Sequence, residues 1–178
     1  MNYIFRHNFY IQFKAPNCEQ LIAQLNTETS IDNSSFNWGD KCEVDRVPLR
    51  YEDYLDLLQP SVEELSKRLG KPFAFQVSNP WLNIYSQGGY QELHDHWDED
   101  IAGVFFLNDG NNFYFRERHN TEISFSMRKL MDCSEYWTPN VCAGDFIFFP
   151  AHMLHGVSKN TSKELRKTLS CNYKLLDE

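Results

Sequence analysis

The chain has 178 residues, of which 42% are hydrophobic and 24% are charged, and its formal net charge at pH 7 is −8. This length is sufficient for one domain with a hydrophobic core, and the acidic balance argues against a general binder of nucleic acid or anionic membranes. No stretch approaches the roughly 20 consecutive apolar residues of a transmembrane helix, so we expect no membrane partner.

The N-terminal part of the chain predicts a strand and helices that pack on the outside of a sheet. Residues 3–13 alternate loosely between apolar and polar side chains and predict a strand. Asn17, with Gln20 three residues later, resembles a capping box at the start of a helix over residues 17–25. Residues 26–41 are polar and predict a long loop.

Two further helices are predicted before the strand-rich part of the chain begins. Residues 51–58 predict a short helix that Pro60 interrupts, because proline lacks the backbone N–H of a helical turn. Ser61 with Glu64 forms a second capping box, and Gly70 marks the end of the helix that follows.

The rest of the chain, about residues 73–175, has the pattern of strands, and the high aromatic share of 15% suits a β-rich fold. Trp81, Asn83 and Tyr85 lie on one face of a strand whose other face is apolar. The run 101–107 is continuously apolar, as expected for a strand buried on both faces. Other strands are predicted at residues 90–96, 113–115, 144–149 and 166–175, with a longer excursion at 121–138.

The last predicted strand has one mostly apolar face and one polar face. The polar face carries Arg166, Thr168, Ser170, Asn172 and Lys174. If this face meets solvent, the strand is an ordinary amphipathic one. If it faces the interior of a barrel, the polar row requires a ligand, because buried polar groups need hydrogen-bond partners.

Three histidines are candidate metal ligands. His94 and His96 are two residues apart, so on an extended strand both rings point to the same face, and His155 follows much later in the chain. Arg166 comes eleven residues after His155 and is a candidate anion clamp. Clustered imidazoles with open coordination positions suit Fe(II), and also Zn, Cu or Ni.

These residues stand in an ordered set of motifs that resembles the Fe(II)/2-oxoglutarate-dependent oxygenases, in particular their compact bacterial and phage branch. The matching segments are Trp81-Leu82-Asn83, Gly88-Gly89-Tyr90, His94-Asp95-His96, residues 103–107, residues 144–150, Leu154-His155-Gly156-Val157 and residues 166–172. The resemblance implies a mainly β fold with flanking helices, the double-stranded β-helix (jelly-roll, cupin-like) fold. We expect a single domain over residues 1–178 with its core at about 73–175.

The resemblance also implies roles for individual residues. His94 matches the first iron ligand and His155 the distal one. Arg166 matches the basic residue that binds the far carboxylate of 2-oxoglutarate, with Thr168 as its hydroxyl helper. Asn83 and Tyr85 share the face of the ligands and are candidates to contact the keto acid or the substrate.

The chain departs from the superfamily at the second ligand. Most members have His-x-Asp or His-x-Glu, and this chain has His96 in place of the carboxylate. One alternative is that His96 binds the metal and completes a three-histidine site. The other is that Asp98 supplies the carboxylate, since His96-Trp97-Asp98 itself reads His-x-Asp, which would leave His94 beside the site.

The expected activity is that of an Fe(II)- and 2-oxoglutarate-dependent dioxygenase, a hydroxylase that uses O2 and acts on an unidentified protein side chain or small molecule. The alternatives are a metal-dependent jelly-roll enzyme that does not use 2-oxoglutarate and a non-catalytic binding module. Nucleic acid is an unfavoured substrate because the sequence shows no basic groove. The five widely spaced cysteines and the absence of a signal-peptide pattern in residues 1–10 favour reduced thiols in a cytoplasmic protein.

Overall fold

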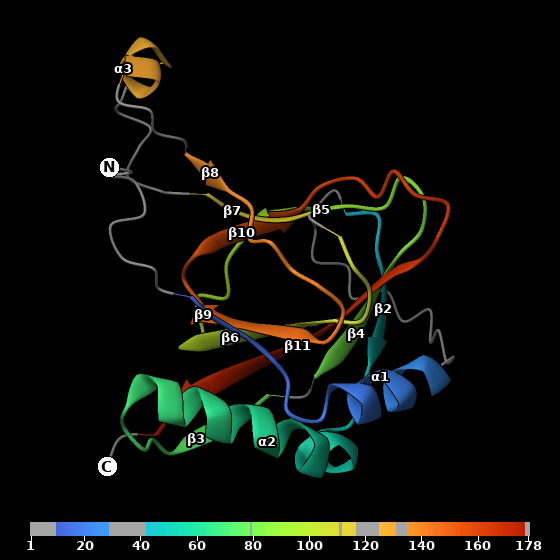
Figure 1. The fold of residues 1–178 in the computed structure, drawn as a ribbon, viewed down its shortest axis with the longest axis vertical. Helices are drawn as coiled ribbons and strands as arrows, with labels where there is room; N and C mark the ends of the chain where they lie inside the picture. Colours follow the sequence, from blue (N-terminus) through green and yellow to red (C-terminus); the bar gives the residue numbers. More distant parts are fainter. Residues whose placement is uncertain are drawn as a thin grey trace.

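A computed structural model describes residues 10–28, 42–78, 80–110, 112–116, 125–130 and 135–176. Two β-sheets face each other, and two helices cover the outer face of the larger sheet (Figure 1). In spatial order the larger sheet contains β1 (Ile11–Lys14), β9 (Asp145–Pro150), β6 (Ile101–Phe106), β11 (Arg166–Leu175), β4 (Trp81–Tyr85) and β2 (Asp45–Pro48), with β3 (Phe75–Val77) paired to β11. The smaller sheet contains β5 (Gln91–His94), β10 (Leu154–Val157), β7 (Phe113–Arg116) and β8 (Tyr136–Trp137).

The helices are α1 (Cys18–Thr27), α2 (Tyr51–Leu69) and α3 (Phe125–Leu130). All pairings between the described strands are antiparallel. The mainly β architecture with flanking helices was predicted from the sequence and is confirmed. None of the described helices has the length and apolar character needed to cross a membrane.

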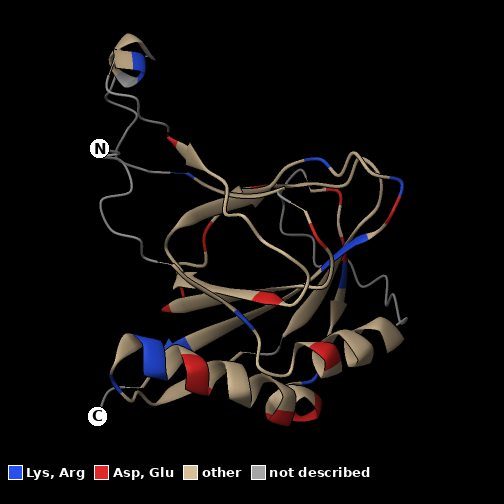
Figure 2. Cartoon of the chain, viewed as in Figure 1, with Lys and Arg blue, Asp and Glu red and all other residues tan. Residues whose placement is uncertain are grey.

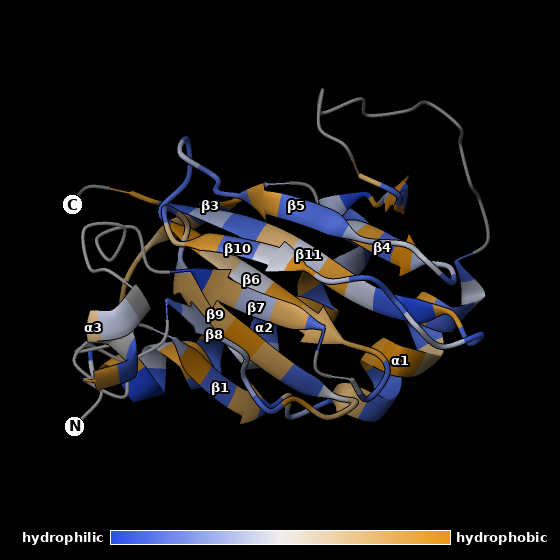
Figure 3. Cartoon of the chain, turned by 90° about the horizontal axis from the view of Figure 1, so that it is seen from above, coloured by the Kyte–Doolittle hydropathy of each residue, from blue (hydrophilic) through white to orange (hydrophobic). Residues whose placement is uncertain are grey.

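The larger sheet separates two hydrophobic clusters, because its strands alternate between its two faces. Toward the helices lie Leu82, Phe105 and Leu169, together with the apolar stripes of α1 and α2. Between the sheets lie Val104 and Phe106, together with aromatic residues of the smaller sheet. β6 is therefore buried on both faces, as its continuous apolar run predicted. Figure 3 shows the resulting bands of alternating hydropathy along the strands, and Figure 2 shows charged residues on the helices and loops and also at the ends of strands such as β9 and β11.

The polar face of β11 points between the sheets, which decides between the two alternatives left open by the sequence. Thr168, Ser170 and Asn172 are each no more than 8% exposed, while Cys171 on the opposite face packs against the cluster under the helices. The polar row is therefore an interior surface, and only Lys174, at the end of the strand, is exposed.

The predicted break at Pro60 is wrong, because α2 is one continuous helix with Pro60 inside it. The buried stripe of Tyr54, Leu58, Val62 and Leu65 continues on one helical face past the proline. Packing of this stripe against the sheet outweighs the lost backbone hydrogen bond. The capping box predicted at Ser61 is consequently also wrong. The predicted end at Gly70 is confirmed, with a left-handed φ of 70° and its N–H donated to the carbonyls of Ser66 and Lys67.

The predicted helix at residues 17–25 is confirmed as α1, but its capping box does not form. The Asn17 side chain instead donates to the carbonyl of Leu57 in α2 at 2.9 Å, which ties the two helices together. Part of the predicted strand at 3–13, most of the predicted loop at 26–41 and part of the excursion at 121–138 lie outside the described residues.

Replacing Pro60 with alanine is expected to stabilise the protein by about 1–3 kcal/mol, because alanine restores a helical N–H and removes the clash of the proline ring with the preceding turn. The gain is reduced by the greater flexibility of the unfolded chain. Urea denaturation of the two proteins measures the difference, and a lower stability of the variant would contradict the expectation.

Candidate metal centre

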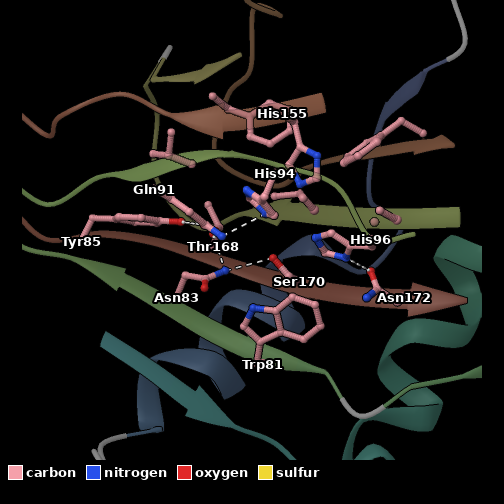
Figure 4. A pocket seen from close by; sticks show the side chains of 16 residues that line it. Trp81, Asn83, Tyr85, Gln91, His94, His96, His155, Thr168, Ser170 and Asn172 are labelled. Atoms are coloured by element: carbon pink, nitrogen blue, oxygen red, sulfur yellow. Dashed lines mark hydrogen bonds between the residues drawn. The ribbon is translucent and has the colours of Figure 1, made fainter. Parts of the chain in front are cut away.

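Three imidazoles converge between the two sheets. His94 ends β5 and lies directly opposite His155 of β10 in the antiparallel register, so both rings point into the same space. His96 reaches it from the turn after β5, where its N–H is donated to the carbonyl of Ala151 at 2.9 Å. The ring centroids are 4.2 Å apart for His94 and His155, 5.3 Å for His94 and His96, and 5.1 Å for His96 and His155. One nitrogen from each ring lies within 4.8 Å of the others, which is a spacing that one metal ion can bridge (Figure 4).

The predicted strand at 90–96 is shorter in the structure, where β5 ends at His94. The two histidines therefore do not share a face because of strand alternation alone. The carbonyl of His96 accepts the N–H of Glu99 at 3.0 Å, which closes a turn directly after the histidine.

Each of the three imidazoles has its Nδ1 against a carbonyl oxygen. Because such an oxygen only accepts, Nδ1 carries the proton, and the lone pair is on Nε2. This is the arrangement by which ligating histidines are held in proteins. The acceptors are the backbone oxygen of Glu92 for His94 at 2.8 Å, the backbone oxygen of Met153 for His155 at 2.9 Å, and Oδ1 of Asn172 for His96 at 2.8 Å.

Burial keeps the two deeper rings neutral. His155 is 4% exposed, and burial together with the neighbouring His94 and His96 holds its pKa well below the ordinary value of a histidine. Burial also lowers the pKa of His96, although its hydrogen bond to Asn172 acts in the opposite direction. Neutral imidazoles are the form that binds a metal ion.

The cavity around the imidazoles has a polar wall and an apolar wall. Asn83 extends from β4 and donates from Nδ2 to Oγ1 of Thr168 at 3.3 Å and to Oγ of Ser170 at 3.0 Å. Its Oδ1 is buried without a hydrogen-bond partner within the part of the chain that the structure describes. The apolar part of the lining includes Phe113, Phe149 and Val157. An unsatisfied buried carbonyl beside an apolar wall indicates space for a ligand with a donor group.

Arg166 begins β11 on the face that carries Thr168. It is 5% exposed, and both Nη1 and Nη2 are buried without a hydrogen-bond partner among the described residues. Its guanidinium carbon lies 5.8 Å from the centre of the Tyr85 ring. A buried cation whose charged nitrogens lack acceptors is costly, so this position favours an anionic ligand, and a carboxylate matches the guanidinium in shape.

Gln91 was not recognised from the sequence, although its side chain contacts both Tyr85 of the larger sheet and His94 of the smaller sheet. Tyr85 donates its hydroxyl to Oε1 of Gln91 at 2.9 Å, and Nε2 of Gln91 lies 3.0 Å from Nε2 of His94. Residues three apart in a regular strand face opposite ways. A register irregularity in the β5–β10 pair, between His155 and Val157, turns Gln91 to the same side as His94.

The structure does not bring Asp98 to the imidazoles. Its side chain is exposed, and its backbone carbonyl accepts a hydrogen bond from Nζ of Lys174 at 2.7 Å. Trp81, in contrast, stacks on His96 with ring centroids 5.9 Å apart. The alternation within β4 placed Trp81 on the site face, but nothing in the sequence indicated that it would support a histidine.

Comparison with protein families gives one match, to the family described as "Putative 2OG-Fe(II) oxygenase", over residues 79–172. This is more than half of the 178 residues and includes the three histidines and Arg166. Comparison with curated protein sequences finds no match.

Solved structures of similar fold come from several bacteria. HygX from Streptomyces hygroscopicus, solved with nickel and 2-oxoglutarate bound, is 12% identical to this chain. The match covers 97% of this chain and 85% of the HygX chain, with a TM-score of 0.66. A prolyl-4-hydroxylase from Pseudomonas putida is 12% identical, and the match covers 97% of this chain and 96% of the hydroxylase chain, with a TM-score of 0.64. A 2OG-Fe(II) oxygenase from Burkholderia pseudomallei is 13% identical, with coverage of 96% and 86% and a TM-score of 0.65.

At these identities the structural likeness supports the fold alone, and it confirms the predicted jelly roll. The family match rests on the sequence itself. The chain therefore belongs to the 2OG-Fe(II) oxygenases, whose cofactors are Fe(II) and 2-oxoglutarate.

Proposed function

We propose that this oxygenase is a dioxygenase that hydroxylates a C–H bond of its primary substrate, while 2-oxoglutarate is oxidatively decarboxylated to succinate. One observation carries the proposal: three imidazoles with Nε2 lone pairs converge on one point between the sheets, and the guanidinium of Arg166, on the interior face of the larger sheet, is buried with both Nη atoms lacking a hydrogen-bond partner among the described residues. The first group suits a divalent metal ion and the second suits a carboxylate.

In this proposal His94, His96 and His155 hold Fe(II). With 2-oxoglutarate and O2, the iron supplies the oxidising chemistry, and the protein supplies binding, orientation and the exclusion of water. The Nδ1 hydrogen bonds keep the three Nε2 lone pairs directed at the metal position. The amide of Gln91 contacts Nε2 of His94 and must give way when that nitrogen binds the metal.

Arg166 is proposed to bind the far carboxylate of 2-oxoglutarate through its two Nη groups, in a bidentate pair. Thr168 adds a hydroxyl donor from the same face. Burial raises the pKa of Tyr85 to about 12, so its hydroxyl stays protonated at neutral pH, and it can donate to a carboxylate once it leaves Oε1 of Gln91. Asn83 offers its unpartnered Oδ1 to a donor on the keto acid or the substrate.

The primary substrate is proposed to be a small molecule or a protein side chain. Among the structurally similar proteins, HygX has also been solved with hygromycin B bound, and another is a prolyl-4-hydroxylase. These two examples cover both substrate classes.

A single domain over residues 1–178 is also part of this proposal. Its support is that the N-terminal third completes the larger sheet: β1 pairs with β9, and β2 pairs with β4. The cytoplasmic location and the bacterial and phage branch stay predictions. The described cysteines (Cys18, Cys42, Cys142 and Cys171) are free thiols.

Anaerobic titration of the Fe(II)-loaded protein with 2-oxoglutarate tests the proposal. We expect a metal-to-ligand charge-transfer band that saturates with 2-oxoglutarate, and succinate release once O2 is admitted. Metal binding without this band would favour a jelly-roll enzyme that does not use 2-oxoglutarate. Absence of metal binding would favour a non-catalytic binding module.

A further inference from the structure

We propose that Asn172 is a positioning residue that sets the ring orientation and the tautomer of His96. The inference rests on the metal site proposed above, and it concerns how one of its three ligands is held. Asn172 itself does not contact the metal in this proposal. It acts on the metal only through His96.

The three ligands differ in how the backbone supports them. His94 and His155 belong to paired strands, and the register alone places their side chains opposite each other. His96 follows the end of β5, so no strand register directs its ring. Its backbone is held by the hydrogen bonds with Ala151 and Glu99, but these leave rotation about the side-chain bonds free.

Side chains from the larger sheet supply the missing constraint. Oδ1 of Asn172 lies 2.8 Å from Nδ1 of His96, and both residues are largely buried, at 8% and 9% exposure. Trp81 stacks against the ring with an interplanar angle of 28°. Together, the amide oxygen fixes the edge of the imidazole and the indole fixes its face (Figure 4).

Asn172 is itself in a rigid position. It lies in β11 opposite Ala102 of β6, and its backbone carbonyl accepts the N–H of Ser78 at 2.9 Å. A hydrogen bond from a side chain so placed restricts His96 more than one from a mobile loop would. The contact therefore prepares the third ligand before any metal arrives.

Of the three oxygens that accept from the histidine Nδ1 atoms, only Oδ1 of Asn172 belongs to a side chain, so it can be removed by mutation. The acceptors for His94 and His155 are backbone oxygens, which remain when side chains change. An amide oxygen is neutral, whereas a carboxylate at the same place would make the imidazole a stronger electron donor. The identity of residue 172 thus sets both the geometry and the basicity of the third ligand.

The test compares Asn172→Leu, which removes the acceptor, with Asn172→Asp, which keeps it. Cys171→Ala is the matched control, because Cys171 is the neighbouring buried residue of β11 on the face away from the site. The readouts are the Kd for Co(II) by anaerobic titration, the Co(II) absorption spectrum, and the melting temperature without metal.

We expect Asn172→Leu to weaken Co(II) binding by roughly 10- to 100-fold and to change the spectrum. Asn172→Asp should bind Co(II) at least as tightly as the wild type, and Cys171→Ala should keep the wild-type Kd even if it melts earlier. An unchanged Kd and spectrum in Asn172→Leu would overturn the inference. Equal losses of affinity in the Leu and Asp variants would also overturn it, because the acceptor would then not matter. If the wild type itself binds no metal, the proposed site fails, and the inference fails with it.

Discussion

His155→Ala is expected to abolish metal binding, raising the Kd for a divalent ion by more than about 100-fold, since loss of an outer hydrogen-bond partner alone costs 10- to 100-fold. His155 is the most buried of the three histidines, and its ring centroid lies within 5.1 Å of both others. Its removal leaves two imidazoles, which is too few for a protein metal site of this type. Anaerobic titration with Mn(II) or Co(II) measures the change.

His152→Ala is the control, because His152 is an exposed residue in the turn before β10. It should bind metal like the wild type. Circular dichroism of the metal-free proteins verifies that both variants fold. Tight metal binding by His155→Ala would mean that another group, such as the Asp98 carboxylate considered from the sequence, completes the site.

Arg166→Leu is expected to weaken 2-oxoglutarate binding by about 100-fold or more while leaving metal binding intact. Truncating one partner of a buried charge pair typically costs 2–5 kcal/mol or more. In the absence of ligand the variant should be as stable as the wild type or more stable, because it removes a buried charge whose terminal nitrogens have no acceptor in the part of the chain that the structure describes.

Calorimetric titration of the Mn(II)-loaded proteins with 2-oxoglutarate measures this effect. Lys167→Gln is the control, because Lys167 is the next residue of β11, and its side chain reaches Asn26 on the opposite side of the sheet at 3.5 Å. It should bind 2-oxoglutarate normally. Wild-type affinity in Arg166→Leu would show that the keto acid binds elsewhere, and a large loss of stability would show that the guanidinium has a structural role.

Side-chain alternation made it predictable which side chains of one strand share a face, so Asn83 was grouped with Tyr85 and Arg166 with Thr168 from the sequence. The sequence left open whether the polar face of β11 meets solvent or the interior, and only the structure shows it buried. The convergence of His155 with His94 was proposed from the pattern of histidines and supported by the resemblance to a family. The strand pairing that produces it could not be predicted from the pattern, because the two strands lie far apart in the chain.

The failures occurred where the surroundings override a local rule. Pro60 ends helices in isolation, but the stripe on either side of it packs against the sheet and keeps α2 continuous. Gln91 should face away from His94 in a regular strand, and only the irregularity between β5 and β10 turns it inward. The apolar stripe across Pro60 is visible in the sequence, but the irregularity at Gln91 leaves no such signal.

The placement of His94 opposite His155 makes the centre sensitive to how the smaller sheet assembles. A slip of β5 by one residue would turn His94 outward and Leu93 inward, while leaving the number of backbone hydrogen bonds almost unchanged. Such a misfolded molecule would be nearly as compact as the native one but unable to capture a metal ion. Binding of a metal ion to the three histidines would therefore favour the correctly paired chain.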